Sequence, residues 1–427
     1  MTNMPRFTWS PDTASERVEA ALKRADNDVA AKSVFTKTLP DRARKMAASA
    51  THHKGSPLAG ALVSVKALFD VEGKVTTAGT KVLQVEPAAS SDAPCIAKLA
   101  DAGATFVGLT NMSEFAYSGL GLNPHFGTPE NPIFKGCLPG GSTSGGAVSV
   151  ALGLCDIAIG SDTGGSLRIP AAFCGIVGFK PSQATVSMEG GKPLSDTLDS
   201  FGPMATSLEA CELAWRVMAG LPDIPVTPAK RQLVIGRNFG FNELDPAIAE
   251  GFEALCGKLT RLGWRIVERP LDSLELFKKI APWHLTSVES RAHYETYFQN
   301  NAEDFDPRVH SRMTRANEIS AVDYRQTLNQ QVAFSNAFAA ELGDDLLILP
   351  TTANLPPTIT DMQSDEAFNQ QNLLALRNPS LANGANGCSI ALPFKHEDLQ
   401  LSAMLVGANN KDETLLACAK ELEADLH

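Results

Sequence analysis

The sequence lacks the local signals of several large classes of protein. No segment approaches the roughly 18 consecutive apolar residues that a membrane-spanning helix needs. The first residues hold no apolar stretch of the kind found in secretion signals. The 37 Lys and Arg against 48 Asp and Glu give a net charge of −11, which disfavours electrostatic binding of nucleic acids. We therefore expect a cytoplasmic protein that binds neither nucleic acids nor membranes.

Spacings typical of metal and redox sites are missing as well. The eight cysteines form no CxxC pair, and the sequence contains no HExxH motif. In a chain of this length, free cysteines are usually small buried side chains of a reducing compartment. The sequence therefore gives no indication of a zinc site or of a disulfide-exchange site.

Predicted strands and helices alternate along the chain, a pattern typical of an α/β architecture. No internal repeat, low-complexity tract or linker-like segment interrupts them, so one large domain is expected. The first helix is predicted to begin with a capping box, Thr13-x-x-Glu16, and residues 274–341 are expected to form a helical, polar cover over the sheet. Helices are predicted at 13–31, 41–50, 92–102 and 245–263, and strands at 61–69, 104–109, 233–236, 264–267 and 345–350.

The stretch from Pro139 to Lys180 is rich in glycine and in hydroxyl side chains. Its two clusters, GGSTSGG at 140–146 and GSDTGGS at 160–166, flank a predicted helix and a short strand. Small residues let the backbone approach a ligand closely, and consecutive N–H groups can hold an anion. The nucleotide-binding motifs GxxxxGKS/T and GxGxxG are absent. The hydrolase motif GxSxG is absent too, since Thr143 lies at the centre of this five-residue window.

A serine nucleophile in this stretch would need a base. None of the eight histidines lies beside a supporting aspartate motif, whereas Lys66 lies within the apolar run Leu62–Phe69. Burial favours the neutral amine over the ammonium, and a neutral lysine can accept a proton. A buried ion pair, or a side chain that reaches the surface, is the alternative for a single lysine in such a strand.

Several segments resemble the amidase signature family of serine amidohydrolases. They are the two glycine-serine clusters with their continuation LRIP (167–170), VSVKALFDVEG (63–73), LTNMSEFAYSG (109–119) and LDSFGPM (198–204). The resemblance implies a single large α/β/α domain, in which helices cover both faces of a twisted mixed β-sheet. Residues 1–57 would then be an N-terminal helical segment packed on the catalytic domain, residues 58–427.

The same resemblance assigns a serine–serine–lysine triad. It implies that Ser166 is the nucleophile, that Ser142 relays the proton and that Lys66 is the base. These roles agree with the chemistry, because an amide carbonyl needs an activated hydroxyl and the leaving amine needs a proton. The family also places a cis peptide bond at the relay serine, so we predict that the Gly141–Ser142 bond is cis.

The family's oxyanion hole falls on the backbone N–H groups of Thr163, Gly164 and Gly165. Such donors stabilise the negative charge that develops on the carbonyl oxygen of an amide under attack. The resemblance implies that the reaction needs no metal ion and no organic cofactor.

Three further residues are candidates for substrate binding. Thr143 takes the place of a serine that many members have, and it keeps the hydroxyl. Arg168, two residues after the nucleophile, could bind a carboxylate substrate bidentately, although we favour a structural ion pair for it. Tyr117 could line an acyl pocket, and aromatic residues at such spacings are also common in cores.

The resemblance implies hydrolysis of a small-molecule carboxamide to a carboxylate and ammonia or an amine, through an acyl-Ser166 intermediate. Compact members are often homodimers, which suggests a homodimer here. One alternative is the A subunit of the tRNA-dependent Asp/Glu amidotransferase, although that protein typically reads SIRQPA where this chain reads SLRIPA (166–171). A second is a hydrolase of biuret- or allophanate-like urea derivatives. A ligand-binding protein without catalysis is disfavoured, because all three residues of the triad are present.

Overall fold

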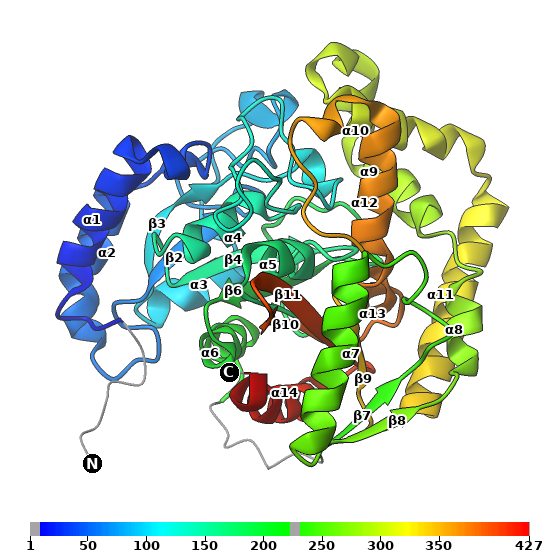
Figure 1. Cartoon of the computed structure of the whole chain (residues 1–427). Helices are drawn as coiled ribbons and strands as arrows, with labels where there is room; N and C mark the ends of the chain where they lie inside the picture. Colours follow the sequence, from blue (N-terminus) through cyan, green and yellow to red (C-terminus); the bar gives the residue numbers. More distant parts are fainter. Residues whose placement is uncertain (1–8, 223–230, 427) are drawn as a thin grey trace.

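The computed structural model describes residues 9–222 and 231–426, and its centre is one β-sheet of eleven strands (Figure 1). In sheet order the strands are β1 (Phe35–Thr38), β3 (Thr105–Thr110), β2 (Leu62–Lys66), β4 (Ile157–Asp162), β6 (Ser200–Ala205), β5 (Val177–Lys180), β10 (Cys388–His396), β11 (Leu399–Gly407), β9 (Leu347–Pro350), β7 (Gln232–Ile235) and β8 (Arg265–Glu268). β2 is parallel to β3 and β4, and β7 is parallel to β8 and β9. The other neighbouring strands are antiparallel. The predicted mixed sheet is confirmed.

The described α-helices follow the alternation that the sequence predicts. They are α1 (Ala14–Asn27), α2 (Pro40–Ser49), α3 (Pro94–Asp101), α4 (Ser144–Ala151), α5 (Arg168–Cys174), α6 (Leu208–Ala219), α7 (Pro246–Arg261), α8 (Asp272–Phe277), α9 (Pro282–Asn300), α10 (Pro307–Thr314), α11 (Ala321–Leu342), α12 (Asp365–Arg377), α13 (Ser380–Gly384) and α14 (Asp412–Leu426). Among them, none is long and apolar enough to cross a membrane.

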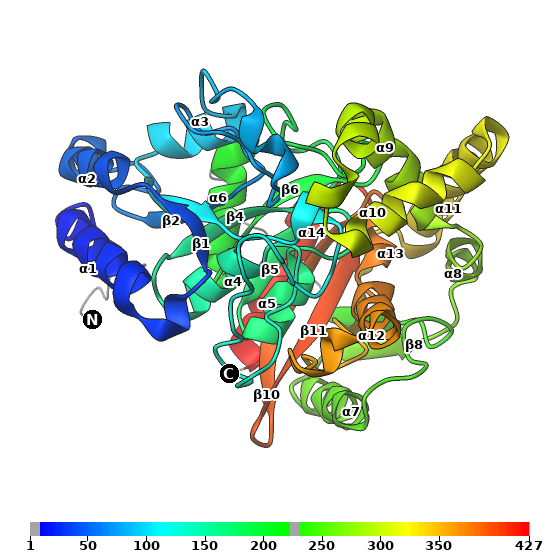
Figure 2. The ribbon, with the colours of Figure 1, turned by 90° about the horizontal axis from the view of Figure 1, so that it is seen from above.

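Helices cover both faces of the sheet. The helices α3, α6, α7 and α14 pack against one face. On the other face, α1, α2, α4 and α5 cover the N-terminal strands, and α8, α11 and α13 cover the C-terminal strands. In Figure 2, α1 and α2 lie at one end of the molecule and α8 and α11 at the other. The helical cover expected at 274–341 is present in α8 to α11.

The N-terminal segment differs from its prediction in two respects. Besides α1 and α2 it contributes strand β1, which pairs with β3 at the edge of the sheet. The predicted capping box is wrong, because the Thr13 hydroxyl donates to the carbonyl of Ser10 (3.2 Å) and makes no bond to the helix. A capping box begins α11 instead, where Ser320 and Asp323 bond each other's backbone N–H.

Helix α4 packs closely on the N-terminal segment, and this contact generates a prediction for Gly145. A Cβ atom at Gly145 would lie 2.2 Å from the Val34 carbonyl oxygen and 2.7 Å from the Asn111 nitrogen. Both are backbone atoms that cannot rotate away, so Gly145→Ala should lower the free energy of unfolding by about 1–3 kcal/mol. Urea denaturation of the purified variant measures this change.

Gly257 provides the matched control within a helix. A Cβ there would meet only the end of the Arg261 side chain, at 3.5 Å. Because glycine costs about 0.5–1 kcal/mol relative to alanine in a helix interior, Gly257→Ala should raise stability slightly. Equal unfolding free energies for the two variants would contradict the tight packing of α4.

Candidate active site

Lys66 is the last residue of β2, and the alternation of side chains between the two faces of the sheet determines where its side chain points. Val63 and Val65 pack in the core beneath α3 and α6. Ser64 faces the opposite layer, where its hydroxyl bonds the Ser149 hydroxyl of α4 at 2.8 Å. Successive side chains of a strand point to opposite faces, so Lys66 lies on the same side as Ser64. The strand therefore directs the amine toward the loop that precedes α4.

The Lys66 amine is fully buried and has hydroxyl partners. Its Nζ donates to Ser142 Oγ at 2.7 Å and to Ser161 Oγ at 2.8 Å. Burial lowers the pKa of Lys66 to about 7, and the charges of Asp199 and Asp162 only partly oppose this shift. A lysine with this pKa is largely a neutral amine above pH 7, which is the form that accepts a proton.

Ser142 lies in the first glycine-serine cluster, immediately before α4. The Gly141–Ser142 peptide bond is cis, as predicted. The Ser142 carbonyl accepts a hydrogen bond from the Ser113 N–H at 3.0 Å. A Cβ at Gly141 would lie 2.6 Å from the nitrogen of Gly121, so only glycine fits beside this turn. The cluster thus brings the Ser142 hydroxyl against Lys66 by close backbone packing.

Ser166 lies in the loop between β4 and α5, and the carboxylate of Asp162 shapes that loop. Asp162 accepts the N–H of Gly165 at 2.8 Å and that of Leu167 at 3.0 Å. The Gly165 N–H, one of the three donors expected for the oxyanion hole, thus points to the carboxylate. Among the hydrogen bonds of the described residues, none uses the N–H of Thr163, Gly164 or Ser166.

Asp199 holds the beginning of the same loop from the other side. It accepts a hydrogen bond from the Thr163 hydroxyl at 2.5 Å, and its second oxygen accepts the N–H groups of Leu194 and Ser195. Burial raises the pKa of Asp199 to about 6, although these hydrogen bonds and Lys66 favour its charged form. The carboxylate therefore fixes Thr163 and adds negative charge near Lys66.

Arg168 is a structural residue in this fold. Its guanidinium is fully buried and pairs with Asp162 at 2.8 Å, while it also donates to Asn383 Oδ1 and to the Pro379 carbonyl. Burial alone would raise the pKa of Asp162, but Arg168, together with Lys180 and the Leu167 N–H, outweighs burial and the pKa falls to about 2. Arg168 does not line the pocket, so the substrate contact considered for it is replaced by the ion pair.

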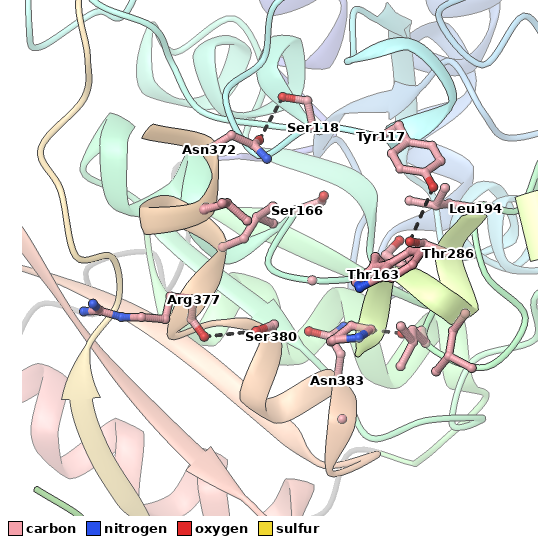
Figure 3. Close-up of a pocket in the computed structure, with 18 of the residues that line it drawn as sticks. Tyr117, Ser118, Thr163, Ser166, Leu194, Thr286, Asn372, Arg377, Ser380 and Asn383 are labelled. Carbon is pink, nitrogen blue, oxygen red and sulfur yellow. Dashed lines mark hydrogen bonds between the residues drawn. The ribbon is translucent and has the colours of Figure 1, made fainter. Parts of the chain in front are cut away.

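A pocket of about 490 Å³ lies beside Ser166 (Figure 3). Ser166, Thr163 and Tyr117 all line it, so Tyr117 lies where a substrate contact is possible. Thr143 is fully buried and is not part of the lining, which places its hydroxyl out of the pocket. In the described part of the chain, no cluster of three His, Cys, Asp or Glu side chains could hold a metal ion.

One wall of the pocket was not singled out from the sequence. It comes from α12 and α13, and it includes Asn372, Ser380 and Asn383 (Figure 3). Asn372 Oδ1 accepts the Ser118 hydroxyl at 3.2 Å and the Gly119 N–H at 2.9 Å, which joins this wall to the Tyr117 loop. Amides scattered on a polar helix form no motif, so the sequence offered no signal for them.

Comparison with known proteins places the chain in a family. A family model described as amidase matches residues 16–416. The chain belongs to the amidase family. The resemblance to amidase signature enzymes is thereby confirmed, and the protein is an amide-hydrolysing enzyme.

Individual relatives agree with this membership. The chain is 32% identical over 385 residues to 2-amino-5-chloromuconic acid deaminase of Comamonas testosteroni, covering 86% of this chain and 82% of the relative. It is 34% identical over 281 residues to the A subunit of the glutamyl-tRNA(Gln) amidotransferase of Methanothermobacter thermautotrophicus, covering 62% of each. A solved amidase crystal structure matches with a TM-score of 0.87 and 30% identity, covering 97% of this chain and 96% of that one.

The buried pair generates a stability prediction for this amidase. Arg168→Met leaves the Asp162 carboxylate charged and unpaired in the interior, so the free energy of unfolding should fall by about 3–5 kcal/mol. Urea denaturation at neutral pH measures the loss. The double variant Arg168→Met/Asp162→Asn removes the uncompensated charge and should recover part of the lost stability. A single variant as stable as the parent would contradict the structural role of Arg168.

Proposed function

We propose that the protein hydrolyses a carboxamide through an acyl-enzyme on Ser166, with Ser142 as proton relay and Lys66 as base. The observation that carries this proposal is the 2.7 Å contact between the buried Lys66 amine and the Ser142 hydroxyl. It lies beside a pocket that Ser166 lines. A lysine whose pKa falls to about 7 is a base matched to neutral pH.

In the acylation step, neutral Lys66 takes a proton from Ser142 while Ser142 takes the proton of Ser166. Ser166 Oγ then forms a bond to the amide carbon, and the carbonyl π electrons move to the oxygen. When the C–N bond breaks, the leaving amine receives a proton that returns from Lys66 through Ser142. Water repeats the sequence on the acyl ester, which releases the carboxylate and restores Ser166.

The negative charge on the tetrahedral oxygen needs donors that are already in place. The N–H groups of Thr163, Gly164 and Ser166 have no acceptor among the described hydrogen bonds, and all three residues line the pocket. Fixed backbone donors of this kind stabilise the transition state without reorganisation. We therefore assign the oxyanion hole to these residues, with Ser166 in the place expected for Gly165.

Ser142 and Ser166 make no direct side-chain hydrogen bond among the described contacts. Their segments do touch, because the Thr143 N–H donates to the Ser166 carbonyl at 3.4 Å. Catalytic hydrogen bonds are often long in the free enzyme and shorten when substrate binds. The proposal therefore requires the Ser142–Ser166 bond to form in the complex.

The A subunit of an amidotransferase is the second candidate function. The match to such a protein favours it, whereas the sequence SLRIPA after the nucleophile departs from the usual pattern of those proteins. The two candidates differ in what they need, since an amidotransferase acts with partner subunits, ATP and tRNA. Hydrolysis of biuret-like compounds would use the same triad on another acyl group.

We further propose that the protein is cytoplasmic and forms a homodimer. Light scattering of the purified chain would test the oligomeric state.

The purified chain alone should release ammonia from an amide without ATP, tRNA or added metal. Ser166→Ala should abolish both hydrolysis and labelling by a fluorophosphonate, because the acyl acceptor is gone. Lys66→Ala should reduce kcat by about 10²–10⁴-fold, the usual contribution of general acid–base catalysis. Ammonia release and mass spectrometry of the labelled peptide measure these effects.

Ser187→Ala changes an exposed serine and is the matched control for labelling. Label on a peptide without Ser166 would remove it as the nucleophile. Activity that needs partner subunits and ATP would transfer the assignment to the amidotransferase.

The pH profile should report the ionisation of Lys66. Because the ammonium form cannot accept a proton, kcat/KM should rise with pH with a midpoint near 7, where Lys66 becomes neutral. Asp199→Asn removes a negative charge that favours the ammonium, so the midpoint should move to lower pH. Asp101→Asn, which changes an exposed carboxylate, should leave the midpoint in place. A midpoint that moves upward in Asp199→Asn would contradict this coupling.

A further inference from the structure

The pocket beside Ser166 has a charge that differs from that of the whole protein. Its walls are largely apolar, yet three arginines line it, namely Arg312, Arg315 and Arg377, against one acidic residue, Glu243. The chain as a whole carries a net charge of −11. A positive pocket in an acidic protein favours a negatively charged ligand over a neutral one.

Two of these arginines already have acceptors. Arg377 donates to the carbonyls of Asn242 and Gly240, and its side chain points away from Ser166 in Figure 3. Arg312 donates to the Tyr117 carbonyl, and to Asn369 on α12 at 3.3 Å. Both therefore hold the walls of the pocket together.

Arg315 differs from both. It begins the short 3₁₀ turn Arg315–Glu318 after α10, and its guanidinium lies over the ring of Trp283, 3.7 Å from the centroid. Trp283 also lines the pocket. Among the described contacts, Arg315 has no hydrogen bond and no carboxylate within ion-pair distance, whereas Arg308 pairs with Asp365 and Arg291 with Glu295.

The stacking on Trp283 orients the free guanidinium. A guanidinium that lies over an aromatic face keeps its N–H donors along its edge, and two parallel donors match a carboxylate. Nearby positive charge adds to the attraction. Burial lowers the pKa of Arg312, Tyr117 and Asp306 oppose this shift, and the charges of Arg308 and Arg315 add to it. An anion beside Arg315 would relieve this repulsion.

We propose that the substrate is an amide that also carries a carboxylate, and that Arg315 binds this carboxylate. The inference rests on the proposed amide hydrolysis at Ser166 and names its substrate class. The carboxylate lies against the wall formed by α9 and the 3₁₀ turn, while the amide reaches Ser166 in the same cavity. The apolar lining between them, which includes Leu285 and Ile280, takes a hydrocarbon spacer.

The test uses matched amides that differ only in charge. Glutaramate and terephthalamate each carry one amide and one carboxylate, and 5-methylhexanamide and 4-isopropylbenzamide replace the carboxylate with an isopropyl group. The expected result is a kcat/KM at least about 10-fold higher for one carboxy-amide than for its neutral partner. In Arg315→Gln the ratio of kcat/KM for the carboxy-amide to kcat/KM for its neutral partner should fall about 10- to 100-fold, the usual effect of losing a hydrogen-bonded charge. The loss should appear mainly in KM.

Arg325→Gln is the matched control, because Arg325 on α11 is exposed, as Arg315 is, but does not line the pocket. It should keep the ratio of the parent. Arg315→Lys keeps the charge without the planar fork, so its ratio should lie between those of the parent and Arg315→Gln. Calorimetry with Ser166→Ala measures carboxy-amide binding without turnover, and adding Arg315→Gln should weaken it.

The outcomes separate this inference from the proposed function. Two outcomes overturn the carboxylate site while hydrolysis at Ser166 stands. One is a parent enzyme that prefers the neutral amides. The other is an Arg315→Gln variant whose kcat/KM falls equally for both amides of a pair. Absence of hydrolysis of every amide, together with absence of fluorophosphonate labelling at Ser166, overturns the proposed function itself. Binding to the Ser166→Ala variant that does not depend on Arg315 also contradicts the assignment.

Discussion

The chemistry of this site depends on one constraint, the burial of the Lys66 amine where β2 ends. An ammonium in this position loses its hydration, and the Ser142 and Ser161 hydroxyls, the Ser161 carbonyl at 3.5 Å and the charges of Asp199 and Asp162 compensate for only part of the loss. The amine therefore becomes a base near neutral pH, although an exposed lysine would be protonated there. Ser142 and Ser161 suit this site because hydroxyls hydrogen-bond both forms of the amine. A carboxylate in direct contact would have fixed the ammonium instead.

A second buried charge holds the loop of Ser166, the proposed nucleophile, in place. Asp162 ends β4, and its carboxylate binds both Arg168 and the backbone of the loop that contains Ser166. Arg168 in turn bonds the Pro379 carbonyl, which lies between α12 and α13, and Asn383, which lines the pocket. The ion pair thus joins the Ser166 loop to the α12–α13 segment. Its desolvation cost is offset because nearly every polar atom of the pair has a partner.

The sequence predicted the core of the site better than its walls, because the residues of each part of the core lie close together in the sequence. The proposed triad comes from two glycine-serine clusters and one apolar strand, and each is recognisable within about ten residues. The hydrogen bond from the Gly165 N–H to Asp162 was not foreseen, because motif spacing does not tell which N–H groups a neighbouring carboxylate accepts. Strand β1 was missed because its short sequence, FTKT, carries too little apolar periodicity to signal an edge strand. Thr13 failed as a cap because a local turn to Ser10 competes for its hydroxyl.

The walls could not be predicted because no single segment forms them. Trp283 and Arg315 meet across the gap between α9 and the turn after α10, and Asn372 reaches the Tyr117 loop from α12. These contacts depend on how helices of the cover pack, which the sequence does not encode at any fixed spacing. The arrangement also has a chemical consequence. Lys66, Ser142 and Ser166 lie on strands and tight loops fixed by backbone packing, whereas much of the remaining pocket lining lies on the covering helices α9, α12 and α13. Substitutions on those helices can therefore change the shape of the pocket while leaving the proposed catalytic residues in place.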